Sequence, residues 1–131
     1  MIGIVVVAHG QLGASLIDCA SYVLGRKPER LQSLSAGQDE DKEKMLLTLQ
    51  ERIAAVDSGA GVLLLTDLYG ASPANLVAAA LQAGRVVGIA GVSLPILLRA
   101  INYRHLPLAE LQVKALAAAT ECVAPMCAGE S

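Results

Sequence analysis

Two residues that could do chemistry each follow a run of aliphatic residues. His9 comes directly after the run 2–8 and before Gly10, and Asp67 comes directly after the run 62–66. An imidazole is reactive near neutral pH, and a carboxylate bonded to one ring nitrogen fixes the tautomer and supports positive charge on the ring. We therefore predict that His9 and Asp67 form a catalytic pair. The alternative is that His9 only ends a strand and Asp67 is an ordinary turn residue.

A short segment of small residues follows Asp67. Ser72-Pro73 is a strong helix start, with the Ser72 hydroxyl as N-cap and the proline in the first turn. Unpaired N–H groups and the positive end of the dipole make such a helix start an anion site. Because Gly70 and Ala71 are small, a phosphate group could approach the backbone closely. We predict that Gly70, Ala71 and Ser72 bind phosphate.

Other polar residues give weaker signals. His105 is interpreted as a surface histidine, and Arg99 and Arg104 are interpreted as residues that solvate a helix face or line a partner surface. No Gly-x-x-x-x-Gly-Lys or Gly-x-Gly-x-x-Gly element is present, so nucleotide binding has no support. The three cysteines lack zinc-ligand spacing. We expect no metal and no cofactor.

The elements that must position these residues alternate between strand and helix. The aliphatic runs predict strands at 2–8, 30–34, 62–66 and 86–92, and the helical spacing predicts helices at 12–24, from 37–39 to 57, 72–83, 94–103 and 107–119. The tail 122–131 is expected to be irregular or an added strand. This alternation predicts a doubly wound α/β protein, with a mainly parallel sheet and helices on both faces. Ligands bind at the carboxyl ends of such strands, where both His9 and Asp67 fall.

Composition and charge exclude several classes of protein. The chain has 131 residues, a size typical of one domain, and its core must be aliphatic because Phe and Trp are absent. The net charge of −2 comes without a basic patch, which argues against nucleic-acid binding. The apolar run 4–8 is too short to span a bilayer, and no secretory leader precedes it. We therefore expect one domain over residues 1–131, no insertion into a membrane, and a cytoplasmic location.

Two longer motifs carry a resemblance to a known family. They are Ile4-Val5-Val6-Val7-Ala8-His9-Gly10 and Leu64-Leu65-Thr66-Asp67-Leu68-Tyr69-Gly70-Ala71-Ser72-Pro73-Ala74-Asn75, and Gly88-Ile89-Ala90-Gly91-Val92-Ser93-Leu94-Pro95 also fits. Almost end to end, the chain resembles the mannose-type enzyme IIA proteins of the bacterial sugar phosphotransferase system. The resemblance implies a flavodoxin-like fold and a homodimer with exchanged C-terminal segments.

The resemblance also implies an activity. The family's histidine accepts a phosphoryl group from the phosphocarrier HPr and passes it to a IIB protein, and His9 matches that histidine. Asp67 matches the aspartate that pairs with it, and Ser72 matches the helix-capping serine or threonine. One departure is Gly70-Ala71, where the family often has Gly-Gly. A second is that no IIB domain follows, so a regulatory target is an alternative acceptor.

Three other functions stay open at this point. A tetrapyrrole metal chelatase also places His-Gly after its first strand, with His105 as a possible second metal ligand, but Gln11-Leu12 follows here instead of Ser-Arg. The donor subunit for dihydroxyacetone kinase shares the fold but is normally fused to further domains. The third alternative is a binding module that captures a regulator according to the phosphorylation of His9.

Overall fold

Four parallel strands form the centre of the molecule. The computed structural model describes residues 1–37 and 41–129. The strands are β1 (Gly3–Ala8), β2 (Leu31–Ser35), β3 (Val62–Thr66) and β4 (Val86–Ala90). They lie in the order β2-β1-β3-β4, and all three pairings are parallel. The predicted short strand after residue 30 is therefore real, and it pairs with β1 at one edge of the sheet.

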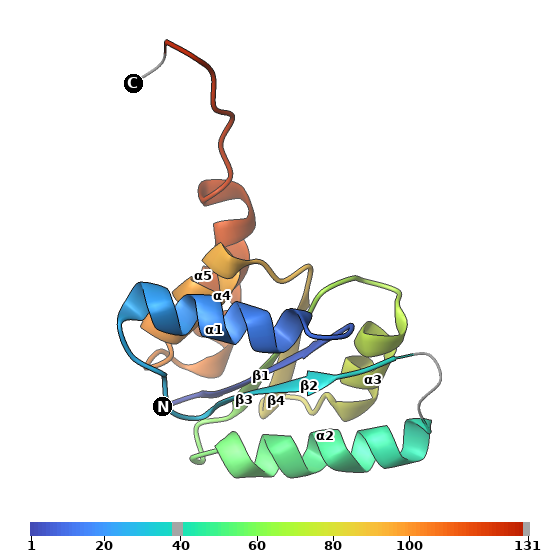
Figure 1. Cartoon of the computed structure of the whole chain (residues 1–131). Coiled ribbons are helices and arrows are strands. Elements are labelled where there is room, and N and C mark those ends of the chain that lie inside the picture. The colour runs from blue at the N-terminus through green and yellow to red at the C-terminus, as the bar shows by residue number, and fades with distance from the viewer. Residues whose placement is uncertain (38–40, 130–131) are drawn as a thin grey trace.

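Five helices cover the two faces of this sheet. They are α1 (Leu12–Leu24), α2 (Lys42–Val56), α3 (Ser72–Ala80), α4 (Leu94–Asn102) and α5 (Leu108–Glu121). Helices α2 and α3 pack on one face, and α1, α4 and α5 pack on the other (Figure 1). The predicted doubly wound, flavodoxin-like arrangement is confirmed. None of the helices in the described part of the chain has the length and apolar character that crossing a membrane requires.

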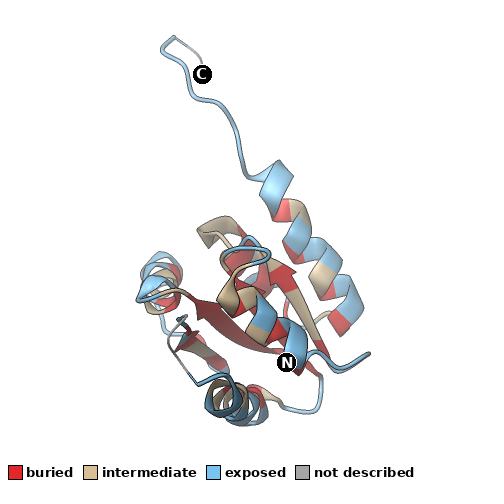
Figure 2. Ribbon diagram, turned by 90° about the vertical axis from the view of Figure 1, so that its right-hand side faces the viewer, coloured by how far each residue is buried: buried red, intermediate tan, exposed pale blue. Residues whose placement is uncertain are grey.

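The core is aliphatic, as the composition predicts. Every residue of the central strands β1 and β3 is buried (Figure 2). Alternate side chains of each strand enter two apolar clusters, one on each face of the sheet. Gly3 allows α2 to end close to β1, because a Cβ at Gly3 would lie only 2.4 Å from the carbonyl oxygen of Val56.

Several predicted boundaries shift by a few residues. Helix α2 begins at Lys42, where the Asp41 carboxylate accepts hydrogen bonds from the N–H groups of Glu43 and Lys44 and caps the helix. The predicted start at 38–39 lies outside the described residues. Helix α3 ends at Ala80 and not at residue 83, because Gln82 exchanges two backbone hydrogen bonds with Val86.

Gly91 sets the end of the last strand. Strand β4 ends at Ala90 and not at residue 92, because Gly91 adopts a φ of 98° and turns the chain. The tail beyond Glu121 forms no strand between residues 122 and 129, and Figures 1 and 2 show it leading away from the body of the molecule. Residues 122–129 are therefore irregular within this chain.

Arg104 corrects the prediction of a solvated arginine. Its side chain is buried, and Nε, Nη1 and Nη2 donate to the carbonyl oxygens of Ile2, Glu29 and Arg30 at 2.9, 2.6 and 2.7 Å. Burial and the nearby positive charges of Arg26 and Arg30 lower the pKa of Arg104. The guanidinium thus ties the amino ends of β1 and β2 together.

Candidate functional site

His9 and Asp67 meet at the carboxyl edge of the sheet. Their strands, β1 and β3, are neighbours in parallel register, so both residues leave the sheet at the same edge. The Asp67 Oδ2 atom lies 2.8 Å from His9 Nδ1 and also accepts the His9 backbone N–H at 3.1 Å. The His9 side chain is 42% exposed, whereas that of Asp67 is only 10% exposed. The largely buried carboxylate of Asp67 therefore holds the half-exposed imidazole of His9 in place.

The charge of Asp67 determines how the ring is presented. Burial by itself raises the pKa of Asp67, but the hydrogen bonds from the His9 ring and backbone outweigh it and hold the pKa below its ordinary value. The carboxyl group is ionised at neutral pH and acts only as an acceptor, so Nδ1 of a neutral His9 carries the proton. Nε2 then keeps its lone pair, as a nucleophile requires.

Gly10 explains how His9 leaves the sheet. Its φ is 51°, a conformation that disfavours residues with a side chain, and nothing lies within 4 Å of where a Cβ would be. The chain turns there, and Leu12 donates its N–H to the carbonyl oxygen of His9 at 3.2 Å as α1 begins. This turn ends the buried strand at His9 and leaves the space beside the imidazole open.

The predicted phosphate-binding segment lies beyond Asp67, and one detail of the prediction is wrong. Ser72 is not the N-cap of α3; Ala71 is, with an extended backbone and no side-chain cap. The carbonyl of Ala71 accepts the N–H of Asn75 at 3.0 Å, so the N-cap lies one residue earlier than predicted. Gly70 has a φ of 82° and open space at its Cβ position.

The start of α3 still presents hydrogen-bond donors. In the part of the chain that the structure describes, the backbone N–H groups of Ser72 and Ala74 have no acceptor. Pro73 between them has no N–H to satisfy. Two free donors at the positive end of a helix favour an anion. Phosphate binding by Gly70, Ala71 and Ser72 stays a prediction, and the Ser72 hydroxyl does not cap the helix as predicted.

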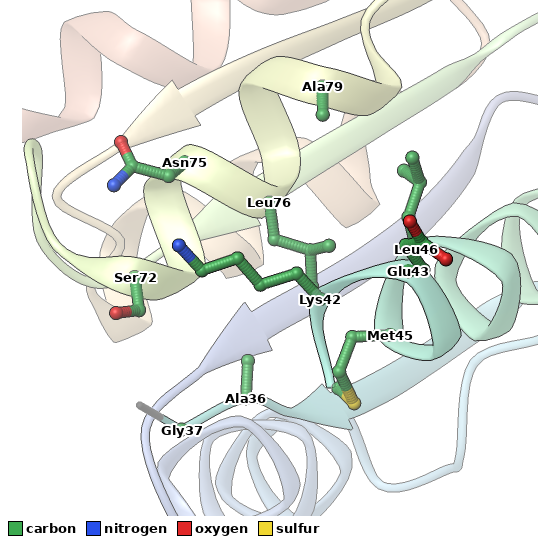
Figure 3. A pocket seen from close by; sticks show the side chains of 10 residues that line it. All are labelled: Ala36, Gly37, Lys42, Glu43, Met45, Leu46, Ser72, Asn75, Leu76 and Ala79. Atoms are coloured by element: carbon green, nitrogen blue, oxygen red, sulfur yellow. The ribbon is translucent and has the colours of Figure 1, made fainter. Parts of the chain in front are cut away.

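A cavity of about 270 Å³ lies beside the start of α3 (Figure 3). Lys42, Ser72 and Asn75 are polar residues at its wall, and its apolar wall includes Met45 and Leu76. Ala36 also lines it, and the Ala36 N–H donates to the carbonyl of Ala8, the residue before His9. The cavity therefore belongs to the edge that carries His9. Lys42 was missed in the sequence because its mixed-charge run is typical of a solvated helix start.

The structure does not bring His105 to this site. His105 lies between α4 and α5 and stacks on Tyr103, with ring centroids 6.2 Å apart. The adjacent Arg104 carbonyl accepts the N–H of Ile2, at the amino end of β1. His9 follows the opposite end of the same strand. A metal site that uses both histidines, as the chelatase alternative requires, has no geometric support.

The fold and this edge define a class: flavodoxin-like α/β proteins with an exposed histidine oriented by a buried aspartate. The family described as "PTS system fructose IIA component" matches residues 3–120. The chain belongs to this family, and it is therefore a protein of the sugar phosphotransferase system. No curated protein matches it.

Solved structures of the same kind share the fold. The phosphotransferase system component EIIA from Streptococcus agalactiae has a TM-score of 0.83 and 22% identity, over 95% of this chain and 97% of that one. The mannose/sorbose specific IIA subunit from Enterococcus faecalis has a TM-score of 0.81 and 18% identity, over 99% and 98%. The PTS IIA protein associated with the fucose utilization operon from Streptococcus pneumoniae has a TM-score of 0.73 and 25% identity, over 88% of each chain.

Proposed function

We propose that the protein is a phosphohistidine carrier that accepts a phosphoryl group on Nε2 of His9. The observation that carries the proposal is the 2.8 Å contact between His9 Nδ1 and the Asp67 carboxylate, beside an imidazole that is half-exposed. This contact leaves Nε2 as the free nucleophile and aims it away from the sheet. Membership of the IIA family supports the same chemistry.

The transfer needs no proton to leave the ring. The Nε2 lone pair attacks phosphorus and forms the N–P bond while the bond from phosphorus to the donor histidine breaks, and its electron pair stays on the donor nitrogen. Positive charge that develops on the ring of His9 is balanced by Asp67. The N–H groups of Ser72 and Ala74, with Gly70 and Ala71 leaving room, hold the phosphoryl oxygens.

Exposed apolar side chains around the site suit docking of a protein donor. Leu12 follows the His9 turn, and Leu68 and Tyr69 follow Asp67, and all three are exposed. Apolar groups gathered at the edge of a polar site are typical of a protein interface. The donor is an HPr-type phosphocarrier, and the acceptor is a IIB protein or a regulatory target. The protein works in the cytoplasm, where those partners are found.

A homodimer with exchanged C-terminal segments is the second part of the proposal. Strand β4 is an edge strand within the described sheet, and an open strand edge readily pairs with another chain. The tail also carries exposed apolar side chains, since Val123 is 70% exposed and Met126 is 96% exposed. Exchange of the tails would cover both features at once.

Labelling with phosphoenolpyruvate tests the carrier function. In the presence of enzyme I and HPr, the wild-type protein should gain one acid-labile, alkali-stable phosphate, and His9→Ala should gain none. His105→Ala is the matched control and should label like the wild type, since His105 lies at the other end of the sheet. Labelling of His9→Ala, or an unlabelled wild type with cognate partners, would contradict the proposal.

A further inference from the structure

The cavity between α2 and α3 takes no part in the proposed phosphoryl transfer. Its volume of about 270 Å³ is near the lower end of the range for small-molecule pockets, which begins at about 300 Å³. The residues that line it come from the segment after β2, from the first turns of α2 and from α3. Three elements that are separate in the sequence thus line one space, and this space has room for a single small molecule.

Lys42 gives one side of this cavity a positive charge. Figure 3 shows its side chain reaching from the start of α2 toward α3, with the ammonium group on the side of Ser72 and Asn75. The ammonium, the hydroxyl and the amide can all donate hydrogen bonds. Among the described residues that line the cavity, Glu43 carries the one carboxylate, and it lies on the far side from the ammonium group (Figure 3). The side with Lys42 therefore favours an anionic group.

The remaining wall of the cavity is largely apolar. It includes Met45 and Leu46 from α2 and Leu76 from α3, and these three side chains are only partly buried. A ligand that covers them removes apolar surface from water, and the flexible methionine can adjust to its shape. An inorganic anion would leave this wall exposed, and a neutral apolar molecule would make no use of the Lys42 charge. The cavity therefore suits a ligand with both an anionic group and an apolar body.

We propose that this cavity binds a small organic anion, a carboxylate or phosphate monoester with an apolar body, whose anionic group lies against Lys42, Ser72 and Asn75. The cavity shares Ser72 with the segment proposed to hold the phosphoryl oxygens. Because two negative groups held beside the same residue repel each other, the ligand and the phosphorylated form of His9 oppose each other. This coupling rests on the proposed carrier function, whereas the binding of the anion does not.

Phenyl phosphate is the probe for this cavity, because it joins a phosphate group to a small apolar ring. Its titration into the unphosphorylated protein, labelled with 15N, should shift the backbone amide signals of Leu46 and Leu76, with a dissociation constant of about 1 mM. Lys42→Met should raise that constant about tenfold, the factor expected for one hydrogen bond to a charged group. Lys44→Met, an exposed position on the same helix outside the cavity lining, is the matched control and should bind like the wild type.

Two smaller probes test the chemical class of the ligand. Inorganic phosphate lacks the apolar body and benzyl alcohol lacks the charge, so each should bind in the cavity about tenfold more weakly than phenyl phosphate. Equal affinity of either smaller probe would overturn the proposed class. The proposed site is wrong if Lys42→Met binds phenyl phosphate as tightly as the wild type, or if only the amides of Ser72 and Ala74 shift, since the probe then occupies the phosphoryl site alone.

The phosphorylated protein tests the coupling between the cavity and His9. Its affinity for phenyl phosphate should be about fivefold lower than that of the unphosphorylated protein, a factor at the lower end of couplings between two sites. Equal affinity of the two forms would overturn the coupling. If the wild type takes up no phosphate from phospho-HPr, the carrier function fails, while the titration of the unphosphorylated protein still decides whether the cavity binds an organic anion.

Discussion

At the scale of single residues, the two ring nitrogens of His9 have different roles. Nδ1 of His9 is bound to a carboxylate that is 10% exposed, and Nε2 faces the open edge. The Asp67 carboxylate also accepts the N–H groups of His9 and Leu68, so it is fixed by three donors. A carboxylate held in this way orients the imidazole without having to take its proton.

Asp67→Asn tests that orienting role. The amide keeps the size of the carboxylate but can present its NH2 group to Nδ1 and select the wrong tautomer. We expect the rate of phosphate uptake from phospho-HPr to fall by about ten- to a thousand-fold, less than the roughly ten-thousand-fold loss in the serine-protease case. The circular dichroism spectrum should not change.

Asp18→Asn, an exposed position on α1, is the matched control for this measurement and should keep the wild-type rate. A folded Asp67→Asn protein that takes up phosphate as fast as the wild type would remove Asp67 from the mechanism.

At the scale of elements, one buried arginine holds the end of the sheet opposite to the site. Arg104, in the connection from α4 to α5, donates three hydrogen bonds to backbone carbonyls that flank β1 and β2. Strand β2 is short and lies at an edge, so this side chain compensates for its limited pairing. The site and its support therefore occupy opposite ends of the same strands.

Arg104→Met should destabilise the fold without changing the contact between His9 and Asp67. Methionine fills part of the space but leaves the carbonyls of Ile2 and Glu29 without their donor, and we expect a loss of about 2–4 kcal/mol in the free energy of unfolding. Urea denaturation measures it. Arg85→Met is the control, because the Arg85 side chain is exposed and its contact with Asp57 is long, at 3.5 Å. If the two variants are equally stable to urea, the stabilising role of Arg104 is wrong.

Sequence patterns predicted elements better than their ends. The buried runs of β1 and β3 are unambiguous, and they place His9 and Asp67 on one edge through the rule for parallel strands. The end of α3 was missed because the backbone bridge between Gln82 and Val86 depends on a chain reversal that side-chain periodicity does not encode. The burial of Arg104 was missed because its partners are carbonyl groups up to 102 residues away, which no residue type reveals.

At the scale of the whole molecule, one group of exposed apolar side chains lies on α5 and the tail. Val113 and Leu116 on α5 are exposed, as are Val123 and Met126 beyond it. Apolar side chains gathered along one side of a molecule are typical of an interface between subunits.

Light scattering at micromolar concentration should therefore give twice the chain mass of 13.5 kDa. Truncation after Glu121 removes the segment that is exchanged in the proposed dimer, and it should give the mass of the monomer. A wild-type protein that is monomeric at that concentration would contradict the proposed assembly.

The position of the phosphate on the imidazole tests the central claim most directly. NMR of the phosphorylated protein, labelled with 15N in its histidines, distinguishes a phosphate on Nε2 from one on Nδ1. Because Nδ1 of His9 is bound to Asp67, the phosphate should be found on Nε2 of His9. A phosphate on Nδ1 of His9, or on His105, would contradict the account.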